Sequence, residues 1–318
     1  MHLQDVVMQI STEISPKFTV FTPTYNRAHT LHRVYESLKA QSYKNFEWLV
    51  VDDGSTDGTY HLIEAWRKSS YFSIVYLQQP NYGKHIAFNR GVKLAKGELF
   101  LPIDSDDAFL PDSLEKMLYW WELIPASLRL KYTGIVTLCQ FENAQVCGDL
   151  FAEHPLDTNA LDLRYKYKKR GESWGFHRTE VLKKYPFPED ISVRFIPENI
   201  VWDAIASKYQ IRCINEPLRV FYQDSGNQIT KASPHKKALV KDYFLQMLNR
   251  DLQYFKHDPK TFIKWAVLYV RYSLHAGDIN FMRLSRYKSV GAFVLCCTAI
   301  VPGIAVFFLD SFRKAINV

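Results

Sequence analysis

The sequence predicts an α/β fold, in which a mostly parallel sheet is flanked by helices and followed by a helical C-terminal extension. Over the N-terminal half, short apolar runs alternate with segments of helical periodicity about every 30 residues, as in successive βαβ units. One apolar run, at 97–103, ends abruptly in three carboxylates. The chain beyond residue 230 lacks this alternation and contains an uncharged apolar run at 289–309.

The hydrophobic periodicity predicts the order of strands and helices in the N-terminal half of the chain. Thr30 is the expected N-cap of the first helix, and Asp57 is expected to cap the second. Because the carboxyl ends of parallel strands meet at one edge of a sheet, residues 24–26, 52–53 and 104–106 should lie together there. Strands are expected at 18–22, 46–51, 74–77, 97–103 and 134–138, and helices after each of the first three strands (the third at 85–94) and at 114–123.

Composition narrows the class of protein. A hydrophobic share of 47% over 318 residues indicates a globular chain and excludes a disordered or repetitive one. The net charge of +7 predicts an anionic partner: nucleic acid, a phosphorylated substrate or an anionic membrane surface. Five cysteines at no metal-ligand spacing favour a reducing compartment. Residues 1–15 carry neither the basic start nor the apolar block of a signal peptide, so we expect the chain to begin in the cytoplasm.

The carboxylates at the end of the 97–103 run are candidate metal ligands. Asp104 and Asp106 would repel each other unless a cation lay between them, and Mg²⁺ or Mn²⁺ prefers such oxygen ligands. The alternative is an acidic turn in which Asp106 or Asp107 only caps the helix that follows Pro111. Taken alone, the Asp-x-Asp pattern is a weak signal and favours the cap, so the other motifs of the chain have to decide between the two interpretations.

Four motifs together resemble the family 2 glycosyltransferases. They lie at 21–27, at 50–57, at 81–83 with 89–91, and at 104–107, in the order and spacing of that family. The resemblance is strong over about the first 110 residues and looser to about residue 222. It implies a GT-A fold, a divalent metal (Mn²⁺ or Mg²⁺) and inversion at the anomeric carbon of the sugar.

The resemblance also implies roles for individual residues. Asp53 would read uracil, Asp104 would face the ribose, and Asp106 would bind the metal that bridges the two phosphates. The family often carries Arg where this chain has Phe88, so the sequence leaves open whether phosphate is contacted from that helix by Lys84 or Arg90. The implied nucleotide-sugar-binding residues are Pro23, Thr24, Tyr25, Asn26, Arg27, Asp53, Gly83, Lys84, Asn89, Asp104, Ser105 and Asp106.

An acceptor site is implied by the second half of the motif set. Trp174 and Gly175 lie in a segment that resembles the acceptor-binding part of the family, and Trp202 is either a pocket or a core residue. An inverting transfer needs a carboxylate to take the acceptor proton. Where the family has a Glu-Asp pair, this chain has Glu198 followed by Asn. Glu198 is therefore the first candidate base, with Asp203 second and Asp190 third; the alternative for Glu198 is a helix N-terminal charge.

Three further segments have open interpretations. The basic run 164–170 is a solvated face or a patch for an anionic acceptor or lipid headgroups, and the polar stretch 223–231 is a loop that could order over the donor. The run 289–309 is a membrane span, a kinked hairpin in one leaflet, or a buried helix pair. We favour the leaflet anchor. The domain boundaries follow as a tail at 1–16, a catalytic domain at 17–230 (halves 17–110 and 111–230) and a helical region at 231–318.

These inferences converge on a membrane-associated glycosyltransferase on the cytoplasmic side of the cell membrane, peripheral or monotopic through its C-terminal segment. It would move a hexosyl or N-acetylhexosaminyl group from a UDP-sugar to a glycan or lipid-linked acceptor of a bacterial capsule, exopolysaccharide or lipopolysaccharide, and no nucleic-acid partner is expected. One alternative is a metal-dependent nucleotidyl or phosphoryl transferase, although the chain lacks Gly-x-x-x-x-Gly-Lys-Ser/Thr. The other is a non-catalytic glycan-binding relative of the fold.

Overall fold

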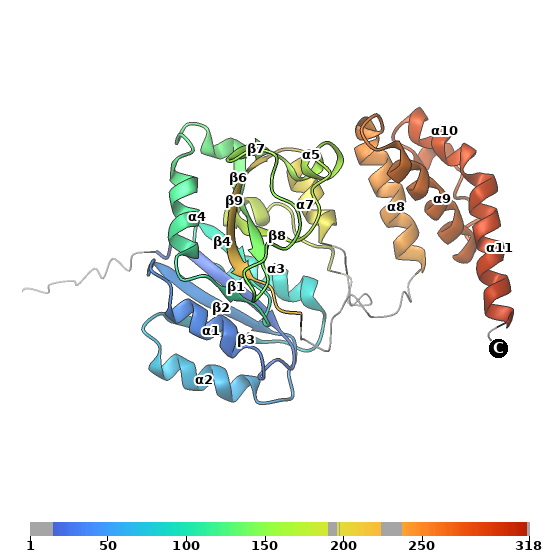
Figure 1. Ribbon diagram of the computed structural model, residues 1–318. Coiled ribbons are helices and arrows are strands. Elements are labelled where there is room, and N and C mark those ends of the chain that lie inside the picture. Colours follow the sequence, from blue (N-terminus) through green and yellow to red (C-terminus); the bar gives the residue numbers. More distant parts are fainter. Residues whose placement is uncertain (1–14, 190–195, 197, 224–236, 317–318) are drawn as a thin grey trace, which may run out of the picture.

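The computed structural model describes residues 15–189, 196, 198–223 and 237–316, and within them a nine-stranded sheet lies between helices (Figure 1). The strands are β1 (Phe18–Thr24), β2 (Phe46–Asp52), β3 (Ser73–Gln78), β4 (Leu99–Pro102), β5 (Ala108–Phe109), β6 (Tyr132–Gln140), β7 (Leu156–Thr158), β8 (Ser173–Arg178) and β9 (Gln210–Val220). The helices are α1 (His32–Lys39), α2 (Thr59–Ser69), α3 (Lys84–Leu94), α4 (Ser113–Glu122), α5 (Ala160–Tyr165), α6 (Thr179–Leu182), α7 (Asn199–Ala206), α8 (Lys237–Asp251), α9 (Pro259–His275), α10 (Val290–Thr298) and α11 (Ile300–Ile316).

The strand order is β3-β2-β1-β4-β8-β6-β9-β5, with β7 paired to β9. The first four strands of this order are parallel, as predicted, and their register sets Thr24 beside Asp52 and Asp52 beside Gln78. The second half of the sheet is mixed: β8 is antiparallel to β4 and β6, whereas β9 is parallel to β6. The α/β fold prediction is therefore confirmed, with the parallel part concentrated in the N-terminal half.

Both faces of the parallel strands are covered, which explains why their sequences are continuously apolar. Phe18, Val20 and Trp48 join the core cluster that includes residues of α1, α2 and α4. Phe21 and Leu49, which point the opposite way, join the cluster that includes residues of α3, α6 and α7. Because of this double cover, only the ends of the strands are accessible to a ligand.

In each of the first two helices, the N-cap lies one position after the residue that the sequence predicts. The first helix begins one residue later than predicted: Leu31 is the N-cap of α1, and the Thr30 hydroxyl donates to the Arg27 carbonyl at 3.4 Å instead. The N-cap of α2 is Gly58 rather than the predicted Asp57, but the Asp57 carboxylate still accepts from the backbone N–H of Thr59, the first residue of α2, at 3.0 Å.

The C-terminal helices α8 to α11 gather into a helical region at one side of the sheet (Figure 1). In the part of the chain that the structure describes, no single helix is long and apolar enough to cross a membrane. The pair α10 and α11, taken to Asp310 and bent by 51°, passes that test together by length and composition. The bend precedes Pro302, which lies in the first turn of α11, where a missing N–H is tolerated. Gly303 brings α11 close to α9, since a Cβ there would lie 2.6 Å from Val270.

Candidate functional site

The loops that follow β1 and β2 hold each other at the carboxyl edge of the sheet. Asn26, at φ +53°, donates its backbone N–H to the Ser55 hydroxyl at 2.8 Å and accepts from the Thr56 N–H at 2.8 Å. Burial works against the charge of Asp57, but hydrogen bonds from Thr59 and Ala28 lower its pKa. Among the predicted donor residues here, Tyr25 is exposed, whereas Pro23 and Arg27 are partly buried. Thr24 is buried, and its hydroxyl has no hydrogen-bond partner among the described residues.

The paired acids at the end of β2 are both buried, and Asp52 accepts from the backbone N–H of Ser55, in the loop before α2, at 2.7 Å. Asp52 accepts from the Tyr76 hydroxyl at 2.7 Å, and burial together with this carboxylate raises the pKa of Tyr76. Asp53 accepts from the Gln79 side chain at 2.6 Å and from the Gly83 N–H at 2.8 Å. Gly83 enters α3 at φ +104°, a conformation that favours glycine. Asp53 thus shapes the loop before α3, and its reading of uracil stays a prediction.

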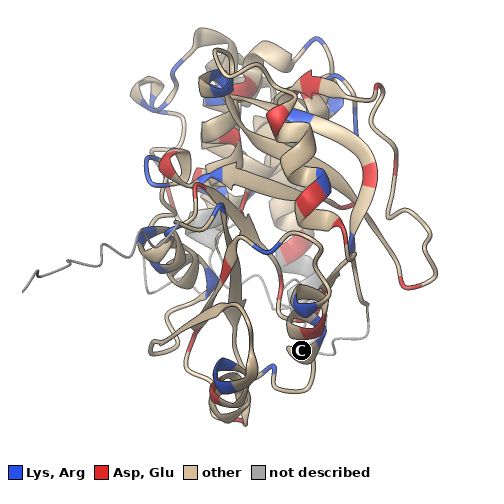
Figure 2. Ribbon diagram, turned by 90° about the vertical axis from the view of Figure 1, so that its left-hand side faces the viewer, with Lys and Arg blue, Asp and Glu red and all other residues tan. Residues whose placement is uncertain are grey.

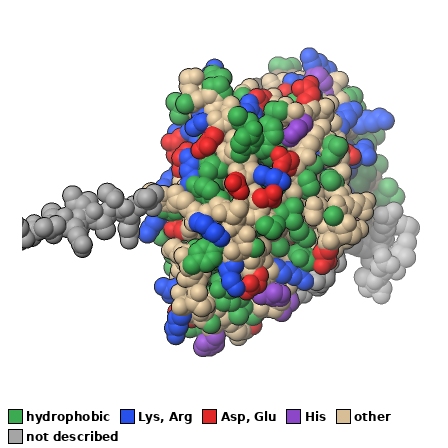
Figure 3. Space-filling view, turned by 60° about the vertical axis from the view of Figure 1, so that its left-hand side comes forward, with side chains coloured by type: hydrophobic (Ala, Val, Ile, Leu, Met, Phe, Trp, Pro, Cys, Tyr) green, Lys and Arg blue, Asp and Glu red, His purple; other side chains and the backbone are tan. Residues whose placement is uncertain are grey.

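The loop after β4 carries three acids that are balanced by cations from elsewhere in the chain. Asp104 accepts from Lys84 at 2.8 Å, and this ammonium lowers the pKa of Asp104 to about 2 although burial opposes the shift. Asp107, almost fully buried, lies 2.6 Å from the Arg219 guanidinium. Asp106 lies 3.9 Å from Arg27. Acidic and basic residues are likewise interspersed along the ribbon (Figure 2) and over the face shown in Figure 3.

Lys84 joins the predicted donor and acceptor halves of the site. Its ammonium lies 2.8 Å from Asp104 and 3.0 Å from Glu198, the residue that precedes α7. Burial disfavours the charge of this ammonium, but Asp104 and Glu198 raise the pKa of Lys84. The Lys84 side chain therefore links Glu198, the first candidate base, to the Asp-x-Asp loop, although Glu198 and Asp104 are almost a hundred residues apart in sequence.

Three residues of this cluster were missed by sequence reasoning. Arg219 lies 2.6 Å from Asp107 and 3.8 Å from Asp104, and the Tyr222 N–H donates to Asp107 at 3.2 Å. Arg33 donates to the Asp106 carbonyl at 3.1 Å. Neither arginine belongs to a motif, so no local signal marked them.

The side chains that could bind a metal near the acidic loop suit an ion that is held mainly by a bound nucleotide. Within the described ranges, no group of three or more His, Cys, Asp or Glu side chains converges. Mg²⁺ at nucleotide sites is nevertheless usually held by one or two carboxylates, with phosphate oxygens and water completing the shell. Asp106 meets this requirement, because its carboxylate is partly exposed and has no cation closer than Arg27 in the described part of the chain. The residues present therefore fit Mn²⁺ or Mg²⁺.

Several other predicted site residues lie in the supporting structure. Asn89 is buried and exchanges hydrogen bonds of 2.9 Å with the backbone of Phe187. Phe88, at the position where the family often has an arginine, lies in the core and is not available to a phosphate. Trp202 stacks on His177 at 4.7 Å and joins the same core cluster. Ser105 is buried within the acidic loop.

Trp174 and Gly175 lie on β8, beneath the acidic loop. The Trp174 indole is buried and donates to the carbonyl of Pro102, two residues before Asp104, at 2.5 Å. Gly175 allows β6 to approach, because a Cβ there would lie 1.9 Å from the Ile135 carbonyl oxygen. Both residues support the floor of the site.

The second candidate base lies away from the cluster. Asp203 is fully buried and is bound by Arg164 at 2.7 Å and by Arg250 of α8 at 2.6 Å. A carboxylate without exposed surface that is shared by two guanidinium groups does not reach an acceptor hydroxyl. We therefore assign Asp203 a structural role. The third candidate, Asp190, and most of the predicted loop at 223–231 lie outside the described residues.

Comparison with sequences finds glycosyltransferases. The family model "Glycosyl transferase family 2" matches residues 19–128. An uncharacterized glycosyltransferase of Nostoc sp. (alr2836) is 34% identical over 229 residues, 68% of this chain and 68% of the relative. "Putative teichuronic acid biosynthesis glycosyltransferase TuaG" of Bacillus subtilis is 32% identical over 130 residues, 41% of this chain. The chain spans about half the length of TuaG, 50%, and 17% of a Rickettsia felis relative.

Comparison with solved structures finds the same fold. TarS 1–349 of S. aureus in complex with UDP has a TM-score of 0.59 at 19% identity, covering 94% of this chain and 92% of that chain. Its complex with UDP-GlcNAc has a TM-score of 0.56 at 21% identity, covering 91% and 80%. At these identities the likeness shows the GT-A fold alone.

The Asp203 cluster generates a stability prediction. Asp203→Ala removes the buried carboxylate shared by Arg164 and Arg250, which are partly buried, while Arg250 keeps its contact with Asp251. We expect the free energy of unfolding to fall by about 1–3 kcal/mol in urea titrations. Asp242→Ala is the matched control, since the side chain it removes is 65% exposed. The control should cost less than about 1 kcal/mol. Similar small losses in both variants would contradict the structural role.

Proposed function

Because the chain belongs to glycosyltransferase family 2, we propose that it transfers a sugar from a UDP-sugar, with inversion, to a hydroxyl of a glycan or lipid-linked acceptor in bacterial cell-surface polysaccharide synthesis. One observation carries the proposal: Lys84 contacts both Asp104 of the donor loop and Glu198, the candidate base. In an inverting displacement the acceptor oxygen attacks the carbon from which the diphosphate oxygen leaves, so the group that takes the acceptor proton and the loop that holds the donor must lie close together.

The donor half has groups suited to each part of a nucleotide sugar. Tyr25 offers an exposed ring, and the buried Thr24 hydroxyl has no partner among the described residues, so both are available to the base and ribose. Lys84 offers an ammonium to the diphosphate. A bound Mn²⁺ or Mg²⁺, held by Asp106, would supply positive charge to the leaving diphosphate.

The chemical step assigns the proton to Glu198. The acceptor oxygen forms a bond to the anomeric carbon as the bond from that carbon to the diphosphate oxygen breaks, and UDP leaves with the electron pair. Glu198 takes the proton of the attacking hydroxyl. Its side chain is 50% exposed, so an acceptor can approach it, and Lys84 fixes the orientation of its carboxylate.

The donor site is tested by calorimetric titration of UDP and UDP-sugars in Mn²⁺ and in chelator. We expect UDP to bind more tightly with Mn²⁺, and Asp106→Ala to abolish that gain because the variant lacks the carboxylate that would hold the ion. Asp112→Ala removes an acid of similar size whose side chain is 45% exposed, and it should bind like the wild type. Metal-independent binding, or an unchanged Asp106→Ala variant, would contradict this site.

The base is tested with Glu198→Gln, which keeps the shape of the side chain but accepts no proton. Sugar transfer, followed as UDP release with a bacterial polysaccharide fraction as acceptor, should fall roughly 10²–10⁴-fold. The Kd for the UDP-sugar should change less than about tenfold, since Asp104 still holds Lys84. Glu153→Gln, at an exposed glutamate, is the control. Full turnover by Glu198→Gln would assign the base to another residue.

We also propose that α10 and α11 attach the protein to an anionic membrane surface. Their outer face presents Val290, Val301 and Phe308, which are 73%, 77% and 64% exposed. The opposite face packs against α9 through Gly303, so the pair resembles a shallow anchor on a folded support. The exposed cations Arg283 and Lys288 precede the pair, where they can meet acidic headgroups.

Membrane attachment is tested by co-sedimentation of the full chain with phosphatidylcholine vesicles, with and without phosphatidylglycerol. The double substitution V301D and F308D should lower binding at least about tenfold, because charged groups replace apolar area that would enter the leaflet. Leu130→Asp is the control, at a leucine that is 72% exposed outside these helices. Equal binding by the double variant and the wild type would contradict the attachment.

A further inference from the structure

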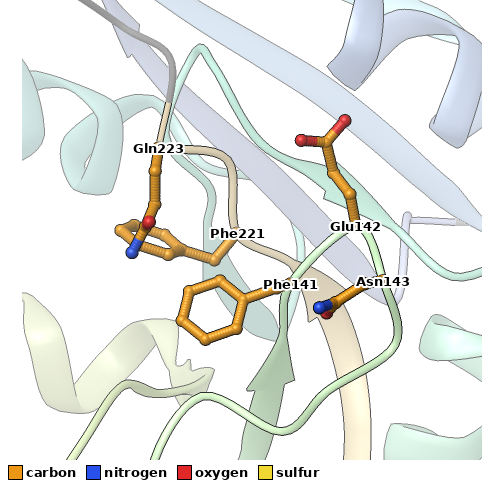
Figure 4. Close-up of a pocket in the computed structure, with 5 residues that line it drawn as sticks. All are labelled: Phe141, Glu142, Asn143, Phe221 and Gln223. Atoms are coloured by element: carbon orange, nitrogen blue, oxygen red, sulfur yellow. The ribbon is translucent and has the colours of Figure 1, made fainter.

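A pocket of about 360 Å³ opens beside the acidic loop, and neither the motifs nor the cluster around Lys84 accounts for it. Figure 4 shows the five residues that line it: Phe141, Glu142, Asn143, Phe221 and Gln223. The first three follow β6 and the other two follow β9. Because β6 and β9 are parallel and Gln140 pairs with Val220, both segments leave the sheet at the same edge.

The pocket is joined directly to the donor loop. Arg219, which ends 2.6 Å from the Asp107 carboxylate, also places its guanidinium 5.6 Å from the centre of the Phe221 ring. The Phe221 N–H donates to the Gln140 carbonyl at 2.8 Å, and the next N–H along the chain, of Tyr222, donates to Asp107. Phe221 is thus held in place by the same contacts that balance the acidic loop.

The chemistry of the lining indicates a neutral, polyhydroxylated ring. The rings of Phe141 and Phe221 lie 6.3 Å apart at 54°. In Figure 4 the Asn143 amide lies beside the Phe141 ring, and Gln223 is drawn over the Phe221 ring. Of the five lining residues, the ionised one is Glu142, which disfavours phosphate. Two amides and a carboxylate disfavour a lipid tail. The axial C–H groups of a pyranose suit the electron-rich face of an aromatic ring, and its equatorial hydroxyls suit amides.

We propose that this pocket binds a pyranose ring, with Phe141 and Phe221 contacting its C–H face and Asn143, Gln223 and Glu142 its hydroxyls. The proposal rests on the proposed function, since it names a saccharide at the border of the same site. The ring belongs either to the sugar of the donor or to the terminal residue of the acceptor, because the pocket adjoins the loop that would hold the diphosphate.

The experiment compares the wild type with Phe141→Ala, Phe141→Leu and Phe221→Ala. Calorimetry measures the Kd of UDP, UDP-glucose and UDP-N-acetylglucosamine. Saturation-transfer NMR measures binding of methyl glycosides of glucose, galactose and N-acetylglucosamine in the presence of UDP. Tyr119→Ala is the matched control, since it removes an aromatic side chain that is 58% exposed and does not line the pocket. Thermal unfolding confirms that each variant folds, and Phe141→Leu keeps apolar bulk without a ring.

We expect Phe141→Ala, Phe141→Leu and Phe221→Ala to bind UDP like the wild type and to lose roughly two- to tenfold in affinity for the sugar. Tyr119→Ala should bind both UDP and the sugar like the wild type. If the variants bind the UDP-sugars more weakly relative to UDP, the pocket holds the sugar ring of the donor. If they bind the methyl glycosides more weakly, the pocket holds the terminal ring of the acceptor. Unchanged sugar binding in the three variants, or no sugar binding by the wild type in either arm, overturns the proposal. A wild type that binds methyl glycosides but no UDP compound would instead refute the donor assignment and leave the pocket supported.

Discussion

The arrangement of the site depends on one electrostatic constraint: the carboxylates of the loop after β4 and of Glu198 converge at the carboxyl edge of the sheet, and cations from distant parts of the chain lie beside them. Lys84 pairs with Asp104 and Glu198, while Arg219 pairs with the buried Asp107, although burial still raises the pKa of Asp107 to about 7. The two cations come from the start of α3 and from β9, so the balance of charge is complete only when both halves of the sheet are assembled. A group of acids that would repel one another in isolation is thus held together by fixed cations, and under the proposed function the phosphates of the donor would meet cations that are already oriented.

The parallel half of the fold was predictable because its strands are buried on both faces and its loops carry contiguous motifs. The strand pairing in the second half of the sheet and the cation pairs of the site could not be predicted, because they depend on contacts between residues that are far apart in the sequence. Arg219 and Tyr222 belong to no motif, and Tyr222 lies 115 residues from the carboxylate to which it donates. Trp202 and Asp203 are neighbours in sequence, yet one stacks on a histidine and the other joins two arginines, one of them on a distant helix. Thr30 illustrates the local limit, since its hydroxyl bonds to Arg27 rather than capping the helix.

Some glycine and aromatic residues of the motif regions serve the packing of the sheet rather than the binding of a ligand. Gly175 and Trp174 were expected at the acceptor, but one permits close strand packing and the other holds the carbonyl before the acidic loop. The sequence did not predict that Phe141 and Phe221 form a pair, because the two residues follow different strands and meet only through the β6–β9 register. Chemistry at such an edge is thus assembled from loop residues that a rigid sheet brings into line.

The double pairing of Asp203 has a consequence for where this chain can be divided. Helix α7, which begins directly after Glu198, is tied to α8 at two points: Asn199 bonds to the Tyr243 hydroxyl, and Asp203 pairs with Arg250. A chain shortened before α8 would keep every donor motif, yet it would lose both tethers and leave a buried acid with half of its counter-charge. The helical extension is thus part of the frame that holds Glu198, the candidate base, and we expect the smallest piece of this protein that folds alone to include α8 as well as the motif-bearing sheet.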